Sequence, residues 1–255
     1  MNPKVVIHDK VSMIIKKIFK ALLGTSSRAE LKFLYALKSH KLTTTVQLMK
    51  ESESQLKQDI FALSINNFKQ NGYFVEFGAL DGIYLSNTYL LENKFMWTGI
   101  LAEPAKTQKS KLRQNRPNAI VCDLCVWKDS TSTLSFIESN KTEFSTINSF
   151  VQENTHYDEQ ATNNIKYEVQ SISLIDLLRR YKAPRNIDYL SIDTEGSEYE
   201  ILKAFNFKEY SFNVITVEHN YTPQREMIFA LLTNNGYKRK HEKISMHDDW
   251  YVKNN

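Results

Sequence analysis

From residue 55 onward, short apolar runs of strand length alternate with segments whose apolar residues recur at helical spacing. The runs predict strands at 73–78, 98–103, 119–127, 187–193 and 212–218. The helical spacing predicts helices at 86–94, 105–115, 173–182, 197–205 and 223–235. Strict alternation of this kind favours a parallel sheet with helices on both faces, because each parallel crossover usually carries a helix.

The remaining parts of the chain depart from this alternation. Residues 1–54 are predicted to form a helical N-terminal extension, and residues 55–255 one α/β domain. Residues 237–239 and 249–252 predict two final strands that pair as an antiparallel hairpin at the sheet edge. The polar stretch 138–166 predicts a long irregular insertion, which we interpret as part of a substrate lid.

Composition narrows the class of protein only a little. With 42% hydrophobic and 24% charged residues, the chain is typical of a soluble globular protein. Its net charge of +4 is spread thinly, so we expect no nucleic-acid partner. The two cysteines, Cys122 and Cys125, are too few for a disulfide framework, and we expect buried thiols in a cytoplasmic protein. Nothing in the sequence indicates an oligomeric state.

The segment 11–23 has the pattern of a basic amphipathic helix. It is too short and too often interrupted by lysine to span a membrane or to serve as a signal peptide. Two interpretations stay open, a helix that lies on a membrane surface and a helix that packs on the domain or on a partner chain. Typical helix amphipathicity favours packing.

Acidic residues lie at or near the ends of all five predicted strands. In strand order they are Glu76 and Asp81, Glu103, Asp123, Asp193 with Glu195, and Glu218, which His219 follows. In open parallel sheets, ligands bind beyond the carboxyl ends of the strands. A single acid there is often a helix N-cap or half of a surface salt bridge. Five together indicate a binding edge, because clustered like charges repel unless a ligand compensates them.

The turn after the first strand restricts the kind of ligand. Gly78 and Gly82 allow close backbone approach, but the spacing lacks the third glycine of the dinucleotide fingerprint. A phosphate-binding P-loop is excluded because no Gly-Lys-Ser or Gly-Lys-Thr follows. Asp81 in the turn would repel a pyrophosphate and suits an ammonium group. S-adenosylmethionine carries an ammonium, a sulfonium, a ribose and an adenine without phosphate, so this edge favours it over NAD or ATP.

These motifs resemble the FkbM family of S-adenosylmethionine-dependent methyltransferases. The resemblance extends from about Ser54 to Val252 and is absent from the first 50 residues. Its segments are 75–82, 86–88, 101–104, 190–198 and 217–220, with 58–59 and 248–252 in support. It implies the seven-stranded class I methyltransferase sandwich, whose last strand is antiparallel. Known members of the family methylate mainly hydroxyls of sugars and polyketides.

The resemblance also implies which residues hold the cofactor. They are Glu76, Gly78, Asp81 and Gly82 for the methionine moiety, Ser86, Asn87 and Thr88 for its carboxylate, Glu103 for both ribose hydroxyls, Asp123 for the adenine amino group, and Asp193 at the neighbouring strand end. The alternative for Asp123 is a strand-end acid that faces solvent.

Methyl transfer to a hydroxyl requires oxygen, carbon and sulfur in line, and it is helped by a base. His219 is the first candidate for this base because its pKa lies near neutral, and Asp193 and Glu195 come next. A histidine that only fixes a loop is an equally weighted alternative. Asp193, Glu195, Glu218 and His219 could instead hold a divalent metal that acidifies the acceptor hydroxyl.

The sequence therefore predicts an S-adenosylmethionine-dependent methyltransferase that acts on a hydroxyl of a saccharide or glycosylated metabolite. We expect the acceptor, a small molecule or glycan, to bind between residues 138–166 and the region after His219. Two alternatives stay open. One is a non-catalytic methyltransferase-like binding or trafficking module, and the other is an NAD-dependent enzyme of Rossmann type.

Overall fold

The structure is a computed structural model that describes residues 28–37, 41–150 and 164–254. The chain divides into two compact units, Met1–Ser52 and Glu53–Asn255. In the first unit, helices α2 (Arg28–Leu37) and α3 (Leu42–Glu51) contact each other. The amphipathic segment 11–23 lies outside the described residues. None of the helices that are described combines the length and apolarity needed to cross a membrane.

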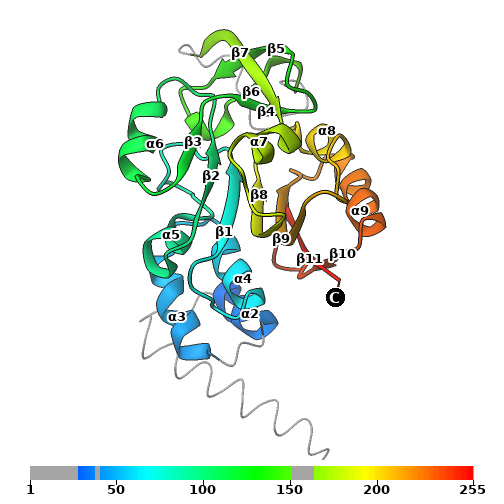
Figure 1. The fold of residues 1–255 in the computed structure, drawn as a ribbon. Coiled ribbons are helices and arrows are strands. Elements are labelled where there is room, and N and C mark those ends of the chain that lie inside the picture. Colours follow the sequence, from blue (N-terminus) through cyan, green and yellow to red (C-terminus); the bar gives the residue numbers. More distant parts are fainter. Residues whose placement is uncertain (1–27, 38–40, 151–163, 255) are drawn as a thin grey trace, which may run out of the picture. The chain divides into compact units, whose positions relative to one another are not determined.

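The second unit is built on a seven-stranded sheet with the strand order β10-β11-β9-β8-β1-β2-β3 (Figure 1). Its strands are β1 (Tyr73–Phe77), β2 (Thr98–Ala102), β3 (Ile120–Cys122), β8 (Asn186–Ile192), β9 (Ser211–Glu218), β10 (Tyr237–Lys240) and β11 (Asp248–Lys253). Neighbouring strands are parallel except where β11 pairs with β9 and β10. The predicted mostly parallel sheet with an antiparallel last strand is confirmed.

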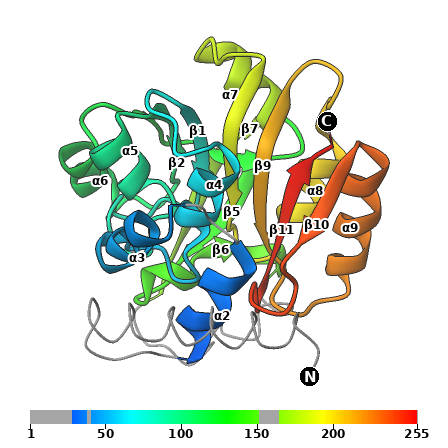
Figure 2. The ribbon, with the colours of Figure 1, turned by 90° about the horizontal axis from the view of Figure 1, so that it is seen from below.

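Helices cover both faces of this sheet, as the alternation predicts. They are α4 (Gln58–Ile65), α5 (Tyr89–Phe95), α6 (Lys109–Asn115), α7 (Leu174–Arg180), α8 (Glu198–Lys203) and α9 (Gln224–Asn234). One face shares a core with α7, α8 and α9, in which Leu190 and Ile215 are fully buried. On the other face α4 contacts β9, and its Phe61 stacks on Trp250 of β11. Figure 2 shows β9, β11 and β10 side by side, with α9 next to β10.

The prediction of one strand over 119–127 is wrong. The chain leaves the main sheet after β3, where the carboxylate of Asp123 forms ion pairs with Lys109 and Arg113 of α6. It then forms β4 (Cys125–Trp127), which pairs with β7 (Ile165–Ser173) in a second sheet of order β4-β7-β5-β6. The other two strands are β5 (Thr133–Glu138) and β6 (Thr146–Ile147).

The prediction that residues 138–166 form an irregular insertion is also wrong in part, because this segment contributes to the second sheet. Its described residues include β6, the start of β7 and two 3-10 turns, Thr142–Phe144 and Asn148–Phe150. The first half of β7 is largely exposed, so it lacks the apolar run by which a strand is recognised in a sequence. Residues 151–163 of the insertion lie outside the described part of the chain.

The loop after β1 requires a glycine at position 78. Gly78 has a φ of +73°, in the left-handed region that glycine adopts without strain. A Cβ atom at this position would lie 2.0 Å from the backbone oxygen of Asp193. Because β1 and β8 are parallel neighbours, the loops at their carboxyl ends converge, and only a residue without a side chain fits between them.

We expect Gly78→Ala to lower the free energy of unfolding more than Gly236→Ala does. Both positions have positive φ, so both variants lose about 1–2 kcal/mol to left-handed strain. At Gly236 nothing lies within 4 Å of an added Cβ, whereas at Gly78 the methyl group meets the main chain. The collision adds about 1–3 kcal/mol. Urea denaturation of the two variants measures the difference, and equal losses would contradict the close approach of the two loops.

Candidate active site

The carboxyl ends of β1, β2 and β8 open into a cavity with about 770 Å³ of empty space. This space includes the open mouth of the cavity, so the cavity is accessible from solvent. Apolar residues of the second sheet, Val126, Phe136 and Ile147, also contribute to its lining. The cavity lies at the edge of the sheet where the strand-end acids predict it.

The structure brings only some of the predicted site residues to this cavity. Those that line it are Glu76, Gly78, Asn87, Glu103, Asp193 and Glu195. Those that do not are Asp81, Gly82, Ser86, Thr88, Asp123, Glu218 and His219. Thr142, Glu143 and Ser145 of the predicted lid segment also contribute to the lining. Among the described lining residues there are five carboxylates and no lysine, arginine or histidine.

Glu76 is buried near the end of β1 and is the acceptor for the start of the next helix. It accepts hydrogen bonds from the backbone N–H of Asn87 at 2.7 Å, from the Ser86 hydroxyl at 3.1 Å and from the Thr88 hydroxyl. Burial raises the pKa of Glu76, although these bonds and nearby Arg116 oppose the shift. The Ser86 and Thr88 hydroxyls were predicted to bind the cofactor carboxylate, but in this structure they donate hydrogen bonds to Glu76.

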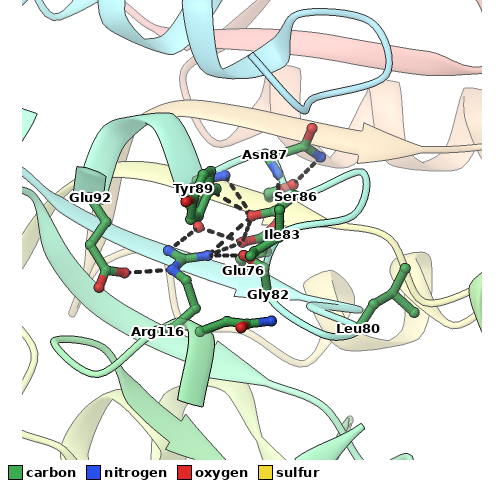
Figure 3. A network of polar contacts seen from close by, with 12 residues as sticks. Glu76, Leu80, Gly82, Ile83, Ser86, Asn87, Tyr89, Glu92 and Arg116 are labelled. Atoms are coloured by element: carbon green, nitrogen blue, oxygen red, sulfur yellow. Dashed lines mark hydrogen bonds and ion pairs between the residues drawn. The ribbon is translucent and has the colours of Figure 1, made fainter. Parts of the chain in front are cut away.

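Arg116 completes this network and was not singled out from the sequence. Its side chain is 1% exposed. It donates to Glu92 at 2.6 Å, to the Gly82 carbonyl at 3.0 Å and to the Thr88 hydroxyl at 2.9 Å (Figure 3). Its guanidinium lies 3.9 Å from the Glu76 carboxylate. Arg116 therefore ties the glycine loop to α5, and no local sequence signal distinguishes it from exposed Arg113.

Asp81 shapes the same loop from its outer side. Its carboxylate accepts hydrogen bonds from the backbone N–H groups of Ile83 and Tyr84, each at 2.9 Å. Asn115 donates to its carbonyl at 2.8 Å. In this structure the side chain caps a turn, a common use of aspartate, and does not line the cavity.

Glu103 lies where the sequence predicts an acceptor for ribose hydroxyls. It is buried, and its two carboxylate oxygens accept hydrogen bonds from the backbone N–H of Leu80 at 2.9 Å and of Ala105 at 2.8 Å. Burial raises its pKa to about 7, and the nearby carboxylate of Glu138 adds to the shift. Because a carboxylate has about four acceptor positions, each oxygen keeps capacity for one more donor.

Glu138 is a second residue that the sequence did not single out. It is buried at the end of β5 and accepts hydrogen bonds from the backbone N–H groups of Lys106 at 3.0 Å and Thr107 at 3.1 Å. The hydroxyls of Thr107 and Tyr167 donate to it as well. The second sheet thereby fixes the loop that follows Glu103.

Asp123, the predicted adenine acceptor, lies outside the cavity. Its carboxylate pairs with Arg113 at 2.7 Å and with Lys109 at 3.1 Å, both on α6. The strand-end cysteines next to it are free and buried, as predicted. Cys125 lines the cavity, and burial raises the pKa of its thiol to about 12. This thiol is therefore uncharged near neutral pH.

Three of the four predicted metal ligands come together. One carboxylate oxygen from each of Asp193, Glu195 and Glu218 lies within 4.8 Å of the other two. His219 is not part of this group. Its Nδ1 accepts the backbone N–H of Tyr221 at 2.9 Å, and its Nε2 lies 3.8 Å from a carboxylate oxygen of Asp249. Burial lowers the pKa of His219, although Asp249 opposes the shift.

Comparison with known protein families identifies the family of this chain. A model of the methyltransferase FkbM domain matches residues 76–239. The chain belongs to this family. The match supports the prediction of an S-adenosylmethionine-dependent methyltransferase, and the resemblance predicted from the sequence motifs is confirmed.

Solved methyltransferase structures are similar to this FkbM domain. An FkbM methyltransferase from Methylobacillus flagellatus KT is 14% identical with a TM-score of 0.48, over 92% of this chain and 58% of the other. A precorrin-6y C5,15-methyltransferase from Geobacter metallireducens GS-15 is 12% identical with a TM-score of 0.41, over 76% and 85%. Aeropyrum pernix fibrillarin, with natively bound S-adenosyl-L-methionine, is 9% identical with a TM-score of 0.39, over 77% and 75%. No curated protein matches the chain significantly.

We expect Arg116→Met to lower the free energy of unfolding by about 3–5 kcal/mol, because it leaves Glu92 and Glu76 buried without their cation. Arg113→Met, three residues earlier on α6, is the matched control. Its side chain is half exposed, so its ion pair with Asp123 contributes about 1 kcal/mol or less. Urea denaturation compares the two, and similar losses would show that the Arg116 network does not hold the loop.

Proposed function

We propose that this FkbM methyltransferase transfers the methyl group of S-adenosylmethionine to a hydroxyl of a saccharide or glycosylated metabolite. The observation that carries the proposal is the charge of the cavity. Its described lining has five carboxylates, Glu76, Glu103, Glu143, Asp193 and Glu195, and no basic side chain. Such a lining favours a ligand with positive charge and disfavours one with phosphates.

The cofactor meets these requirements where NAD does not. Its sulfonium and ammonium groups are cationic, and its ribose hydroxyls can donate to the spare acceptor positions of Glu103. The pyrophosphate of NAD would face carboxylates without a neighbouring cation in the described lining. The charge of the cavity therefore speaks against the NAD-dependent alternative.

A second hollow on the same edge supports the choice of acceptor. It has about 1140 Å³ of empty space, and its lining includes Phe150, Tyr199, Tyr221 and Met227. Tyr221 is 67% exposed, so its ring is accessible to a ligand in this hollow. Aromatic rings pack against the apolar C–H faces of sugar rings, and Asn220 at the border of this hollow offers a hydrogen-bonding amide.

In the proposed reaction the acceptor oxygen attacks the sulfonium methyl carbon. A C–O bond forms, the C–S bond breaks, and the hydroxyl proton leaves to a carboxylate or to water. The products are a methyl ether and S-adenosylhomocysteine. We assign the positioning of the acceptor oxygen to Asp193 and Glu195, which line the cavity. His219 is a weaker candidate than the sequence suggested, because one ring nitrogen accepts a backbone N–H and the other faces Asp249.

We expect calorimetry to detect S-adenosylmethionine binding that weakens as pH falls below 7. Burial raises the pKa of Glu103 to about 7, and ribose hydroxyls donate to its ionised form, so protonation of Glu103 opposes binding. Glu103→Gln should weaken binding about 10–100-fold at pH 8, the loss expected for hydrogen bonds to a charged acceptor, and should flatten the pH dependence.

Asp123→Asn is the matched control for this measurement. Asp123 also follows a strand of the main sheet, but it pairs with Arg113 and Lys109 outside the cavity. Its replacement should leave the Kd within about twofold, since surface ion pairs contribute little. A wild-type protein that binds no cofactor at millimolar concentration would rule out the proposed function. A large loss of cofactor affinity in Asp123→Asn would instead indicate that Asp123 contacts the adenine.

We expect the full chain to convert S-adenosylmethionine to S-adenosylhomocysteine with a saccharide from a panel of methyl glycosides and glycosylated lipids. Mass spectrometry would locate the methyl group on an oxygen. Tyr221→Ala should lower kcat/KM for that acceptor at least tenfold without changing the cofactor Kd, because Tyr221 lines the second hollow and not the first cavity. Methylation of amines but of no hydroxyl would contradict the proposal. Cofactor binding without turnover on any class of acceptor would favour the non-catalytic alternative.

A further inference from the structure

Three carboxylates from two neighbouring strands meet beside the cavity. Asp193 and Glu195 follow β8, and Glu218 ends β9. Because β8 and β9 are parallel and adjacent, their carboxyl ends lie at the same edge of the sheet. One oxygen of each of these side chains lies within 4.8 Å of the others. So close a group of like charges requires protons or a cation to be stable.

Glu218 has an unsatisfied acceptor in this group. The residue is 8% exposed, and its Oε2 has no hydrogen-bond partner. Within the described part of the chain, no lysine, arginine or histidine forms an ion pair with Asp193 or Glu218. A buried carboxylate oxygen without a donor or cation is costly, so Oε2 of Glu218 is suited to a ligand that supplies positive charge.

Glu198 shows how the same region treats an acid that has a structural role. It is as buried as Glu218, but its carboxylate accepts the backbone N–H groups of Thr194 at 2.9 Å and Gly196 at 3.1 Å. The Thr194 hydroxyl donates to it as well, at 3.0 Å. Glu198 thereby holds the turn that presents Asp193 and Glu195. Glu198 therefore has donors for its carboxylate, whereas Oε2 of Glu218 in the same region has none.

We propose that Asp193, Glu195 and Glu218 bind one hard divalent cation, Mg²⁺ or Mn²⁺. Hard cations prefer oxygen ligands, and all three side chains offer carboxylate oxygen. Ligand oxygens on opposite sides of an ion bound at about 2.1–2.4 Å lie about 4.2–4.8 Å apart, so the observed spacing suits one shared ion. His219 is outside this set because its ring nitrogens face Tyr221 and Asp249.

The position of this ion gives it a role in the proposed reaction. Asp193 and Glu195 line the proposed cofactor cavity, while Glu195 and Glu218 line a small neighbouring hollow. Asn220 borders both that hollow and the aromatic one. A cation between them would bind the acceptor hydroxyl and lower its pKa, which makes the oxygen a better nucleophile. This role depends on the proposed function, whereas the binding of the ion does not.

Titration of the full chain with Mn²⁺ in the absence of cofactor tests the site directly. Electron paramagnetic resonance counts the free ion, and we expect one equivalent to bind and to be displaced by Mg²⁺. Glu218→Gln should weaken Mn²⁺ binding at least tenfold, because an amide is a poorer ligand than a carboxylate. Glu209→Gln is the matched control, since Glu209 pairs with Arg179 on the surface and should not affect binding.

Thermal unfolding supplies a second measurement that a merely structural role would not reproduce. Mn²⁺ should raise the Tm of the wild type and of Glu209→Gln, but not that of Glu218→Gln. Without metal, Glu218→Gln should melt no lower than the wild type, because it replaces a buried carboxylate that has an unsatisfied oxygen. If Glu218→Gln does not fold, Asp193→Asn carries the same comparison.

Either of two results would overturn the proposal, a wild type that binds no Mn²⁺ at millimolar concentration or a folded Glu218→Gln that binds as well as the wild type. Cofactor binding is measured separately, so a failure of the proposed function would be distinguishable from a failure of the cation site.

Discussion

The buried carboxylate of Glu76 is the constraint around which the first half of the domain is arranged. A charge inside the protein must be matched by donors, and Glu76 obtains them from the backbone of Asn87 and the hydroxyls of Ser86 and Thr88. To reach this acid, the chain turns back through the glycine loop before α5 begins. Arg116 then fastens the loop from outside. The conformation of the loop between β1 and α5, part of which lines the cavity, therefore depends on the hydrogen bonds that Glu76 accepts.

Two groups of acids at the carboxyl edges of the sheets differ in their consequences. Glu76, Glu138 and Glu198 are surrounded by backbone and hydroxyl donors, and each fixes a loop at the carboxyl edge of a sheet. Asp193 and Glu218 lie at the same edge without an ion pair to a described cation. The first group explains why the loops hold their conformation without a ligand. The second group places carboxyl groups whose pKa is raised by burial where a ligand enters.

The sequence was sufficient for the parts of the fold that depend on local pattern. The alternation of strands and helices, and the acids at the strand ends, follow from periodicities that a single chain displays. The roles of Glu103 and Asp123 could not be separated in this way, because both simply follow an apolar run. Glu103 follows β2, inside the sheet, and is buried, whereas Asp123 follows β3 at the edge, where α6 supplies cations.

Long-range pairing set a second limit on what the sequence could predict. Arg116 lies 24 residues from Glu92, and Glu138 lies 31 residues from Thr107. In each case the sequence shows a polar residue in a polar stretch, which is ordinarily exposed. Only the packing of α6 against the glycine loop, and of the second sheet against the loop after β2, makes these side chains buried. Neither contact leaves a periodic signal.

In the proposed function, the negative charge of the cavity bears on the release of product as well as on binding. Methyl transfer converts a sulfonium into a neutral thioether, so the cofactor loses a positive charge in the reaction. The described lining of the cavity, with carboxylates such as Glu76, Glu103 and Asp193 and no basic residue, therefore attracts the cofactor before transfer more than the product after it. The same lining keeps its field throughout, because the loops that present it are held by the donors to Glu76, Glu138 and Glu198. A cavity arranged in this way favours exchange of product for fresh cofactor without any change in its own structure.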